Sequence, residues 1–398
     1  MDADTMNYGA ILDEIENLES IIPKIDDAIA RGADWLISQS APHGPIMGER
    51  DLSLCHKVAW GLYEANRIPQ VVRLLDWIDA NAKRAPGEYY FPEESPYQKD
   101  RQRVYRFLTF GKIAEMLKHP AYCNDETRER IFQYQHPSGG VFANIDEGKA
   151  LRLEPLNTTF FGQWAIAAGF LDKAEKAGDF IVELVELNAK HFEADRMFFV
   201  RDPQGGNLIT EFSEDVRLNF YIDTKTIKQP SWVTGTCIAL LADLYAINKN
   251  RTCLDAACKL ADFEARCDYR QLFWPSKCKC GWGEAELYRV TADPMHRKLA
   301  ADVARVTFLD AQLPHGGWSH MFYPVKEDGG WRKAVYGGPE RSVPENLPDD
   351  GSYGRLSSHE ITGEFMGELG RIKVAFQDVL HRLRYAKREC ERDTRLRG

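Results

Sequence analysis

Polar and aromatic side chains that could do chemistry lie close to the starts of several predicted helices. Histidine and glutamate can supply protons or hydrogen bonds, and tryptophan rings can hold apolar or cationic groups. The candidates are His56, Trp60, Asn157, Trp232, Cys280, Trp282, Glu284, His359, Glu360 and Glu364. Each residue alone is more often a core or structural side chain, so a function requires an architecture that gathers several of them around one cavity.

The candidate catalytic residues are His359 and Glu284. A predicted helix start lies close before each of them, and a helix N-terminus favours negative charge on a nearby oxygen. We therefore expect His359 to donate a hydrogen bond to a substrate carbonyl or carboxylate, with Glu284 nearby to orient it or the substrate. The residues expected to bind the substrate are His56, Trp60, Asn157, Trp232 and Trp282.

Short helices in paired order must position these side chains. The spacing of apolar residues predicts helices over 21–40, 52–66, 69–83, 101–118, 125–135, 160–169, 172–189, 231–248, 252–267, 280–290, 294–311 and 358–384. Met197 to Phe212 breaks this pattern and predicts a β-hairpin insertion. Gly316 to Ser357 is a long loop rich in glycine and proline, of a kind that is usually functional.

Three stretches of the chain share one pattern. They read FLDAQLPHGGW (Phe308 to Trp318), WLISQSAPHGPI (Trp35 to Ile46) and IFQYQHPSGGVF (Ile131 to Phe142). In each, an aromatic or apolar residue four places before a glutamine lies on the same helix face as that glutamine. Proline and glycine then end the helix and turn the chain. The three copies predict internal repetition of a helix-turn unit.

These stretches resemble the QW motifs of the α/α-toroid superfamily, which includes squalene and terpenoid cyclases and the β subunits of protein prenyltransferases. The resemblance covers nearly the whole chain and implies an all-α fold, an (α/α)6 toroid of about six helical hairpins. Residues 1–17 are expected to be an acidic leading segment and residues 18–398 the toroid. The inner helices would begin near Ser53, Arg101, Thr158, Ser231, Cys280 and Ser358, with their N-terminal ends around a cavity.

The catalytic motifs of these families are only partly present. The Asp-rich element of class II cyclases is replaced by EPLNTTFFGQW, and no DDxxD motif occurs. The zinc ligands of the prenyltransferases are matched in position by Cys278, Cys280 and His359. Two cysteines with one histidine form an acceptable catalytic zinc site. Because the family's aspartate is Cys278 here, we expect a protein that works without a cofactor, with zinc as the alternative.

The expected activity is a cofactor-independent cyclase or isomerase acting on a hydrophobic, terpenoid-type natural product in secondary metabolism. An aromatic cavity without Asp-rich initiators suits catalysis by orientation, and the chain looks similar in type to norbornene-forming Diels–Alderases, so an intramolecular [4+2] cyclisation is the specific expectation. Four alternatives stay open: a zinc-dependent prenyltransferase-like enzyme, a non-catalytic β-like subunit that needs an α-type partner, a non-catalytic apolar-ligand-binding protein, and a carbohydrate-active (α/α)6 enzyme. The last would pair Glu284 or Glu286 with Glu360 or Glu364.

Bulk composition narrows the classes further. The chain has 398 residues, 44% of them hydrophobic, and a net charge of −9, which argues against a nucleic-acid partner. Nine cysteines without an export-type leader favour reduced thiols over a disulfide framework. The apolar stretches are too short to cross a bilayer. We therefore expect a cytoplasmic protein with a small hydrophobic substrate; the sequence indicates no oligomeric state.

Overall fold

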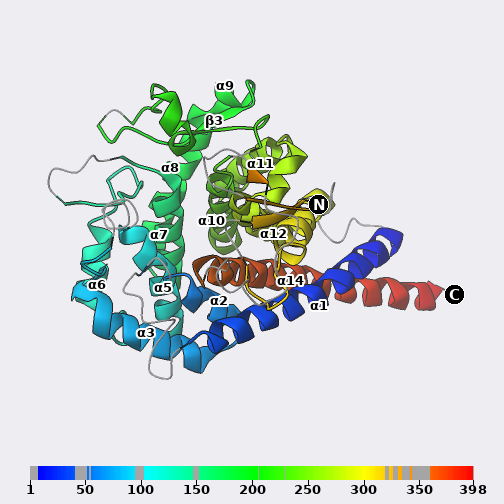
Figure 1. The fold of residues 1–398 in the computed structure, drawn as a ribbon. Coiled ribbons are helices and arrows are strands. Elements are labelled where there is room, and N and C mark those ends of the chain that lie inside the picture. The colour runs from blue at the N-terminus through cyan, green and yellow to red at the C-terminus, as the bar shows by residue number, and fades with distance from the viewer. Residues whose placement is uncertain are drawn as a thin grey trace.

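The computed structural model describes residues 8–40, 52, 55–94, 103–146, 152–204, 206–227, 229–318 and 359–397, together with the backbone of three short strands between 322 and 342. Helices dominate this part of the chain, as Figure 1 shows. No helix among the described residues combines the length and apolar character that a membrane crossing requires.

The helices form two concentric rings. The inner ring contains α2 (Val58–Glu64), α5 (Arg103–Leu117), α7 (Pro155–Ala168), α10 (Trp232–Asn248), α12 (Cys278–Thr291) and α14 (His359–Arg397). Each packs on the next, and α14 packs on α2 to close the ring. The outer helices are α1 (Tyr8–Ser38), α3 (Ile68–Ala82), α6 (Asp125–Phe132), α8 (Leu171–Leu187), α11 (Arg251–Ala265) and α13 (Pro294–Val303). The predicted all-α toroid is confirmed.

Inner helices are buried on nearly all sides and outer helices on one face, and the pattern of apolar residues in each helix explains this difference. The inner helices α7 and α10 are apolar or small on nearly all sides and are buried from their first turn onward. An outer helix such as α8 instead alternates buried positions with exposed charged ones, so it covers the ring with a single face.

Glycine lets inner helices approach closely where the ring closes. A Cβ atom on Gly61 of α2 would lie 2.6 Å from the carbonyl oxygen of Gly363 of α14, so neither position has room for a side chain. Gly235 of α10 likewise faces the backbone of α12 at Lys279 and Cys280. The narrow ring depends on these contacts.

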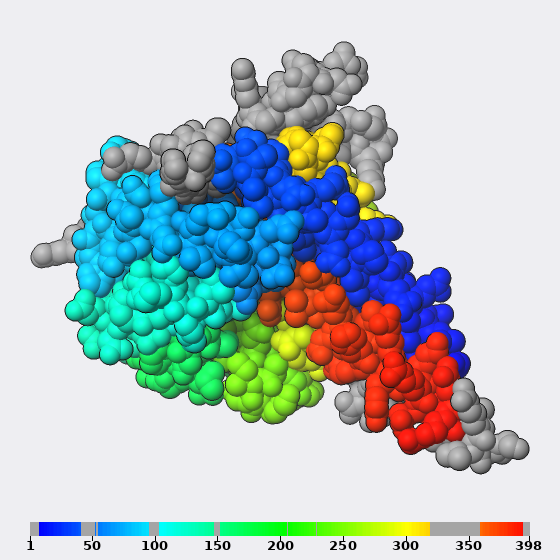
Figure 2. Space-filling view, turned by 90° about the horizontal axis from the view of Figure 1, so that it is seen from below, coloured from blue at the N-terminus to red at the C-terminus, as the bar shows by residue number. Residues whose placement is uncertain are grey.

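The first and last helices make one hairpin of the toroid. Contacts join Tyr8 to Glu391 (3.0 Å), Glu19 to Arg384 (2.7 Å) and Asp26 to Lys373 (2.9 Å), so α1 and α14 run antiparallel. Their outer ends project together from the body of the molecule in Figure 2. The predicted boundary at residue 17 falls inside α1, which crosses it without a break.

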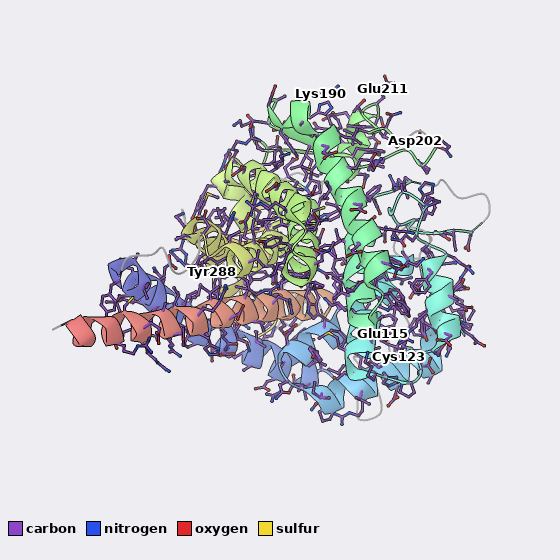
Figure 3. All side chains as sticks on the ribbon, turned by 180° about the vertical axis from the view of Figure 1, so that it is seen from behind. Glu115, Cys123, Lys190, Asp202, Glu211 and Tyr288 are labelled. Atoms are coloured by element: carbon purple, nitrogen blue, oxygen red, sulfur yellow. The ribbon has the colours of Figure 1, made fainter. Side chains whose placement is uncertain are left out.

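The α5–α6 hairpin is fixed by a bidentate ion pair. Arg128 of α6 donates from Nε and Nη2 to the two carboxylate oxygens of Glu115, at 2.9 and 2.8 Å. Glu115 lies near the end of α5, where Figure 3 labels it beside Cys123. Such paired geometry fixes orientation better than a single contact does.

The repeated glutamine joins a helix end to the neighbouring outer helix. Gln312 Nε2 donates to the carbonyl oxygens of Gly316 and Ala28, both at 2.8 Å, and Ala28 belongs to α1. Gln135 Nε2 contacts Gly139 (3.3 Å) and Lys173 of α8 (2.9 Å) in the same way. Each amide therefore ties its own turn to the next repeat. The first copy continues into 41–51, outside the described residues.

The β structure is small but paired differently from the predicted hairpin. The chain does turn after Asp202, whose carbonyl oxygen accepts from the N–H of Gly206 at 2.8 Å, with one bridge between Arg201 and Leu208. However, β3 (Arg196–Phe198) pairs with β4 (Tyr221–Asp223), across a 3-10 helix η4 (Glu214–Asn219). The other strands are β1 (Lys83–Ala85), β2 (Glu88–Tyr89), β5 (Phe322–Val325), β6 (Gly330–Lys333) and β7 (Arg341–Ser342).

Several short elements refine the predicted helix limits. The predicted helix 294–311 is α13 followed by the π-helical turn η7 (Ala304–Leu309), and α9 (Ala189–Phe192) follows α8. The 3-10 helices η5 (Tyr269–Phe273) and η6 (Pro275–Lys277) lead into α12, which starts at Cys278 rather than Cys280. This earlier start places both Cys278 and Lys279 in the first turn.

Candidate functional site

A cavity of about 290 Å³ opens at the N-terminal ends of the inner helices. Every helix of the inner ring contributes at or next to its first turns, through Lys57, Tyr105, Leu156, Trp232, Cys278, Lys279, Ile361 and Glu364. Loops and the short helices η4 and η6 complete the wall with Arg152, Glu154, Phe199, Asn219, Pro275 and Ser276. Free N–H groups and the positive dipole ends of several helices therefore converge on one space.

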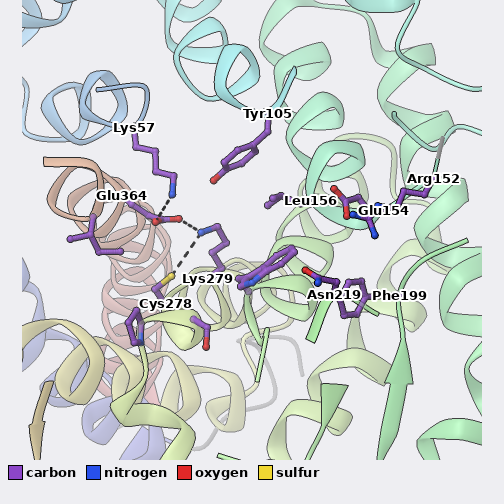
Figure 4. A pocket seen from close by; sticks show the side chains of 14 residues that line it. Lys57, Tyr105, Arg152, Glu154, Leu156, Phe199, Asn219, Cys278, Lys279 and Glu364 are labelled. Carbon is purple, nitrogen blue, oxygen red and sulfur yellow. Dashed lines mark hydrogen bonds and ion pairs between the residues drawn. The ribbon is translucent and has the colours of Figure 1, made fainter. Parts of the chain in front are cut away.

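A buried network of lysines and carboxylates forms one wall of the cavity (Figure 4). Lys57 Nζ lies 2.7 Å from Glu364 and 2.8 Å from Glu360. Lys279 Nζ also donates to Glu364 and lies 3.3 Å from Glu368. Glu364 thus accepts from two ammonium groups, one from the loop before α2 and one from α12.

The electrostatics of this wall are set by burial and by these pairs. Burial alone would lower the pKa of Lys57, but the charge of Glu360 and further neighbours outweigh it and raise that pKa. Burial raises the pKa of Glu368, partly offset by Lys279. Burial, with the charge of Glu368, raises the pKa of Cys278 well above its usual range, so Cys278 stays a thiol and is a poor nucleophile.

The opposite wall carries a second carboxylate and two aromatic rings. Glu154 and Arg152 lie across the cavity from Glu364 and Lys57 in Figure 4. Asn157 Nδ2 donates to Glu154 Oε1 at 2.9 Å and so fixes that carboxylate. Trp232 and Phe199 meet edge to face, with ring centroids 6.1 Å apart.

The charges around the cavity nearly cancel. The cations are Lys57, Lys279 and Arg152; the carboxylates are Glu154, Glu360, Glu364 and Glu368. Three positive groups thus face four carboxylates, and burial raises the pKa of Glu368 among them. The cavity therefore has no large charge excess with which to attract a strongly ionic ligand.

The predicted substrate-binding residues divide into three groups. Trp232 lines the cavity. His56 and Asn157 lie behind its walls: His56 Nδ1 is 3.2 Å from the Leu52 carbonyl oxygen, and Asn157 supports Glu154. Trp60 and Trp282 pack against each other, centroids 5.3 Å apart, deep in the ring, where both are buried.

The structure does not bring the predicted catalytic pair together at this cavity, since neither side chain lines it. Glu284 Oε2 contacts His296 Nδ1 at 2.8 Å, on the side facing α13. The ring of His359 stacks on Trp35 of α1, with centroids 5.0 Å apart, and burial lowers its pKa to about 4. A catalytic role for His359 and Glu284 stays a prediction.

The zinc set suggested by the sequence is also separated. Cys280 Sγ contacts the carbonyl oxygen of Ser231 at 3.0 Å, away from both Cys278 and His359. Within the described ranges, the group whose ligand atoms approach one another closely enough for a metal, within 4.8 Å, is Cys278, Glu364 and Glu368. Lys279 already supplies a positive charge to both carboxylates, so this group does not fit a divalent cation well.

The sequence analysis missed the residues that dominate the cavity: Lys57, Tyr105, Arg152, Glu154 and Lys279. Two of them stand beside candidates that it did name, since Lys57 follows His56 and Lys279 lies between the two cysteines of KCKCGW. Glu364, which also lines the cavity, was among the candidates. The lysines at the same predicted helix starts were the signal that could have completed the set.

Comparison with known proteins places the fold. No protein-family model and no curated protein matches the chain. Among solved structures, a D-mannose isomerase matches with a TM-score of 0.61 at 11% identity, over 87% of this chain and 96% of that one. An unsaturated glucuronyl hydrolase specific for heparin matches with a TM-score of 0.54 at 10% identity, over 88% and 97%. A GH76 α-mannanase from Bacteroides thetaiotaomicron gives 0.53 at 11%, over 88% and 96%.

At these identities the likeness shows the fold alone, and that fold is the α/α toroid. The resemblance to the toroid superfamily is therefore confirmed at the level of architecture. The assignment to its terpenoid cyclase branch and to Diels–Alderases is not supported, because these neighbours are an isomerase and hydrolases named for sugars. The predicted cyclase of a hydrophobic natural product is wrong, and the cavity explains why: its walls carry buried lysines and carboxylates where an apolar lining was expected.

Proposed function

We propose that the protein is an enzyme that uses acid–base catalysis on a neutral sugar, and that aldose–ketose isomerisation is its reaction. The observation that carries this proposal is Glu364, a buried carboxylate held between Lys57 and Lys279 in the cavity at the inner-helix N-termini. The overlap of the fold with a D-mannose isomerase along most of both chains supports it.

Size and charge favour a single neutral sugar unit. A volume of about 290 Å³ is at the lower end of small-molecule sites, which begin at roughly 300 Å³. An acidic sugar would need a surplus of cations, whereas Lys57 and Lys279 already have carboxylate partners. Hydroxyl groups instead suit a wall of alternating donors and acceptors, and the face of Trp232 suits the C–H face of a sugar ring.

The roles follow from the placement of base and donors on one wall. Glu364 would take the proton from C2 of the open-chain aldose, while Lys57 or Lys279 donates a hydrogen bond to the C1 carbonyl oxygen as negative charge develops there. The lysine ammonium group then protonates O1 of the enediolate and regains a proton from the C2 hydroxyl, whose oxygen becomes the ketose carbonyl, while Glu364 returns its proton to C1. No proton or electron is gained or lost overall.

Glycoside hydrolysis is the second candidate, favoured by the position of Glu154 across the cavity from Glu364. Paired carboxyl groups on two sides of a bond are the usual requirement for that reaction. Glu364 belongs to the pair that the sequence suggests for a carbohydrate-active enzyme, and Glu154 takes the place of Glu284 or Glu286 in it. Glu284 pairs with His296, and Glu286 pairs with Arg289 and Arg371.

A substrate panel tests the proposal. Purified protein is incubated in D2O with D-mannose and other neutral aldoses, with their uronates and with aryl glycosides, and products are followed by NMR. We expect ketose formation from a neutral aldose, with deuterium entering at C1. Turnover of uronates alone would contradict the neutral-sugar class, and release of aryl alcohol without any ketose would favour the hydrolase.

Replacement of Trp232 by alanine should raise KM about tenfold and leave kcat within about threefold, since stacking on an aromatic face contributes about 0.5 to 1.5 kcal/mol beyond buried area. Trp232 is only partly buried, so the melting temperature should change little. Steady-state kinetics with the sugar found in the panel measure this. An unchanged KM would remove Trp232 from the binding surface.

A further inference from the structure

A second cavity, of about 340 Å³, opens at the opposite end of the inner helices. It is lined by Glu64, Lys112, Gln163, Asp243 and Arg289 from the C-terminal halves of their helices, and by Trp282 and Arg371 from farther back along α12 and α14. The rings of Trp60, Phe160 and Trp282 meet deep in the ring, and Lys112 from this second cavity lies over Trp60 and Trp282. Nothing in the proposed sugar chemistry uses this cavity.

Its two arginines are already paired. Arg289 lies 2.6 Å from Glu286 and 3.1 Å from Asp243. Arg371 binds the other oxygen of Glu286 and lies 3.9 Å from Asp243. Two guanidinium groups and two carboxylates thus neutralise one another and form a rigid edge of the cavity.

Lys112 is different, because within the described residues no carboxylate lies within 4.0 Å of its Nζ. It is buried, and its contacts are Gln163 Oε1 at 3.4 Å and the faces of Trp60 and Trp282, at 4.5 and 5.4 Å from the ring centroids. The carboxylates of Glu64, Asp243 and Glu286 act on this ammonium group only from beyond 4.0 Å. Because a buried charge without a direct partner is costly, the site has room for an ion-pair partner closer than these carboxylates.

Gln163 adds a second open donor beside this charge. Its side chain is 5% exposed, and Nε2 has no hydrogen-bond partner among the residues that the structure describes. Leaving such a buried donor unpaired costs about 1–3 kcal/mol. The remaining wall is apolar, made by Ile113, Met116, Ile166, Ala167, Ala246 and Ile247.

We propose that this second cavity binds a small organic carboxylate with an apolar body, whose two oxygens accept from Lys112 Nζ and Gln163 Nε2. The ligand's carboxylate would give Lys112 a direct ion-pair partner, and its hydrocarbon part would cover the apolar wall. A phosphate dianion fits less well, because inner-helix C-termini and the carboxylates of Glu64 and Asp243 add negative potential around one ammonium group. This site is independent of the sugar reaction.

The test measures binding of 3-methylbutanoate by calorimetry, with the uncharged 3-methylbutanamide and inorganic phosphate as comparison probes. We expect binding of the carboxylate to be at least about tenfold tighter than that of the amide, since a hydrogen bond to a charged group contributes roughly 1.5–3 kcal/mol. Lys112→Met should weaken it about tenfold or more, and Gln163→Leu to a smaller extent. Lys190→Met, at an exposed lysine at the far edge of the molecule in Figure 3, should not change it.

The pH dependence gives an independent readout. Burial, helped by the charge of Arg371, lowers the pKa of Lys112 to about 8, so its ammonium group is lost as pH rises through 8. The other charged groups at this cavity are Glu64, Asp243, Glu286 and Arg289. Of these, burial and Glu286 raise the pKa of Asp243 to about 6, so Asp243 is ionised across the range tested. Affinity for the carboxylate should therefore fall between pH 7 and pH 9.5.

Three outcomes would overturn the proposal. They are equal affinity for the amide and the carboxylate, unchanged affinity in a folded Lys112→Met protein, and phosphate binding in preference to the carboxylate. If Lys112→Met fails to fold, Gln163→Leu and the pH profile of the wild-type protein still decide the question, and an affinity that stays constant to pH 9.5 counts against it.

Discussion

Replacing Glu364 with glutamine is expected to lower kcat for the neutral sugar by about 10²- to 10⁴-fold, with only a small change in KM. General acid–base catalysis contributes rate factors of this size. Glutamine keeps the shape of the side chain and can hydrogen-bond to the sugar and the lysines, but it cannot take a proton. Lys57 retains Glu360, and Lys279 retains Glu368, so neither ammonium group is left without a carboxylate.

The experiment compares steady-state rates of wild-type and Glu364→Gln protein, with folding checked by circular dichroism and thermal melting. Glu211→Gln is the matched control, because Glu211 is exposed in the β-containing insertion, as Figure 3 shows. A Glu364→Gln protein with at least half the wild-type kcat would exclude Glu364 as the base. The same assay on His359→Ala and Glu284→Gln then tests the residues that the sequence favours.

The architecture was accessible from sequence because its signals are local. The spacing from Phe308 to Gln312 and on to Gly316 falls within nine residues, and the structure uses it as a helix end joined to the next repeat. Helix periodicity is local too. By contrast, the alternation of residue types predicts that 197–212 folds back on itself, whereas β3 pairs with the later strand β4. Alternation marks a strand but does not show which later segment pairs with it.

The residues that line the cavity could not be predicted from local spacing, because the main contacts among them link positions far apart in the sequence. Lys57 and Glu364 are separated by 307 positions, and Lys279 and Glu364 by 85. No spacing rule relates such residues before the ring is closed. The sequence also does not show how far along an inner helix a residue can lie and still line the cavity. Residues at an inner-helix start, such as Lys57 and Lys279, line the cavity, whereas Trp60 and Trp282, three residues later, point into the centre.

Trp60 lies at the centre of the ring of helices. Its replacement by alanine should lower the free energy of unfolding by about 3–5 kcal/mol, the usual cost of truncating a buried large aromatic residue. Trp60 is 1% exposed, meets Trp282 and Phe160 edge to face, and lies under the ammonium group of Lys112 at 4.5 Å. The ring of helices closes around these side chains, so the void cannot collapse without moving α2 against α14. Urea denaturation of both proteins measures the difference.

This result would separate a core residue from a substrate-binding one, which is the role that the sequence predicts for Trp60. If Trp60 fills the centre, the alanine variant should be much less stable but keep KM within about twofold at a temperature where it is folded. Trp232→Ala is the matched comparison, because it removes the same ring from the cavity wall and should show the opposite pattern, a raised KM with little loss of stability. A stable Trp60→Ala protein with a strongly raised KM would mean that the substrate reaches past the first helical turn, and the cavity would then have to extend between α2 and α12 to the position of Trp282.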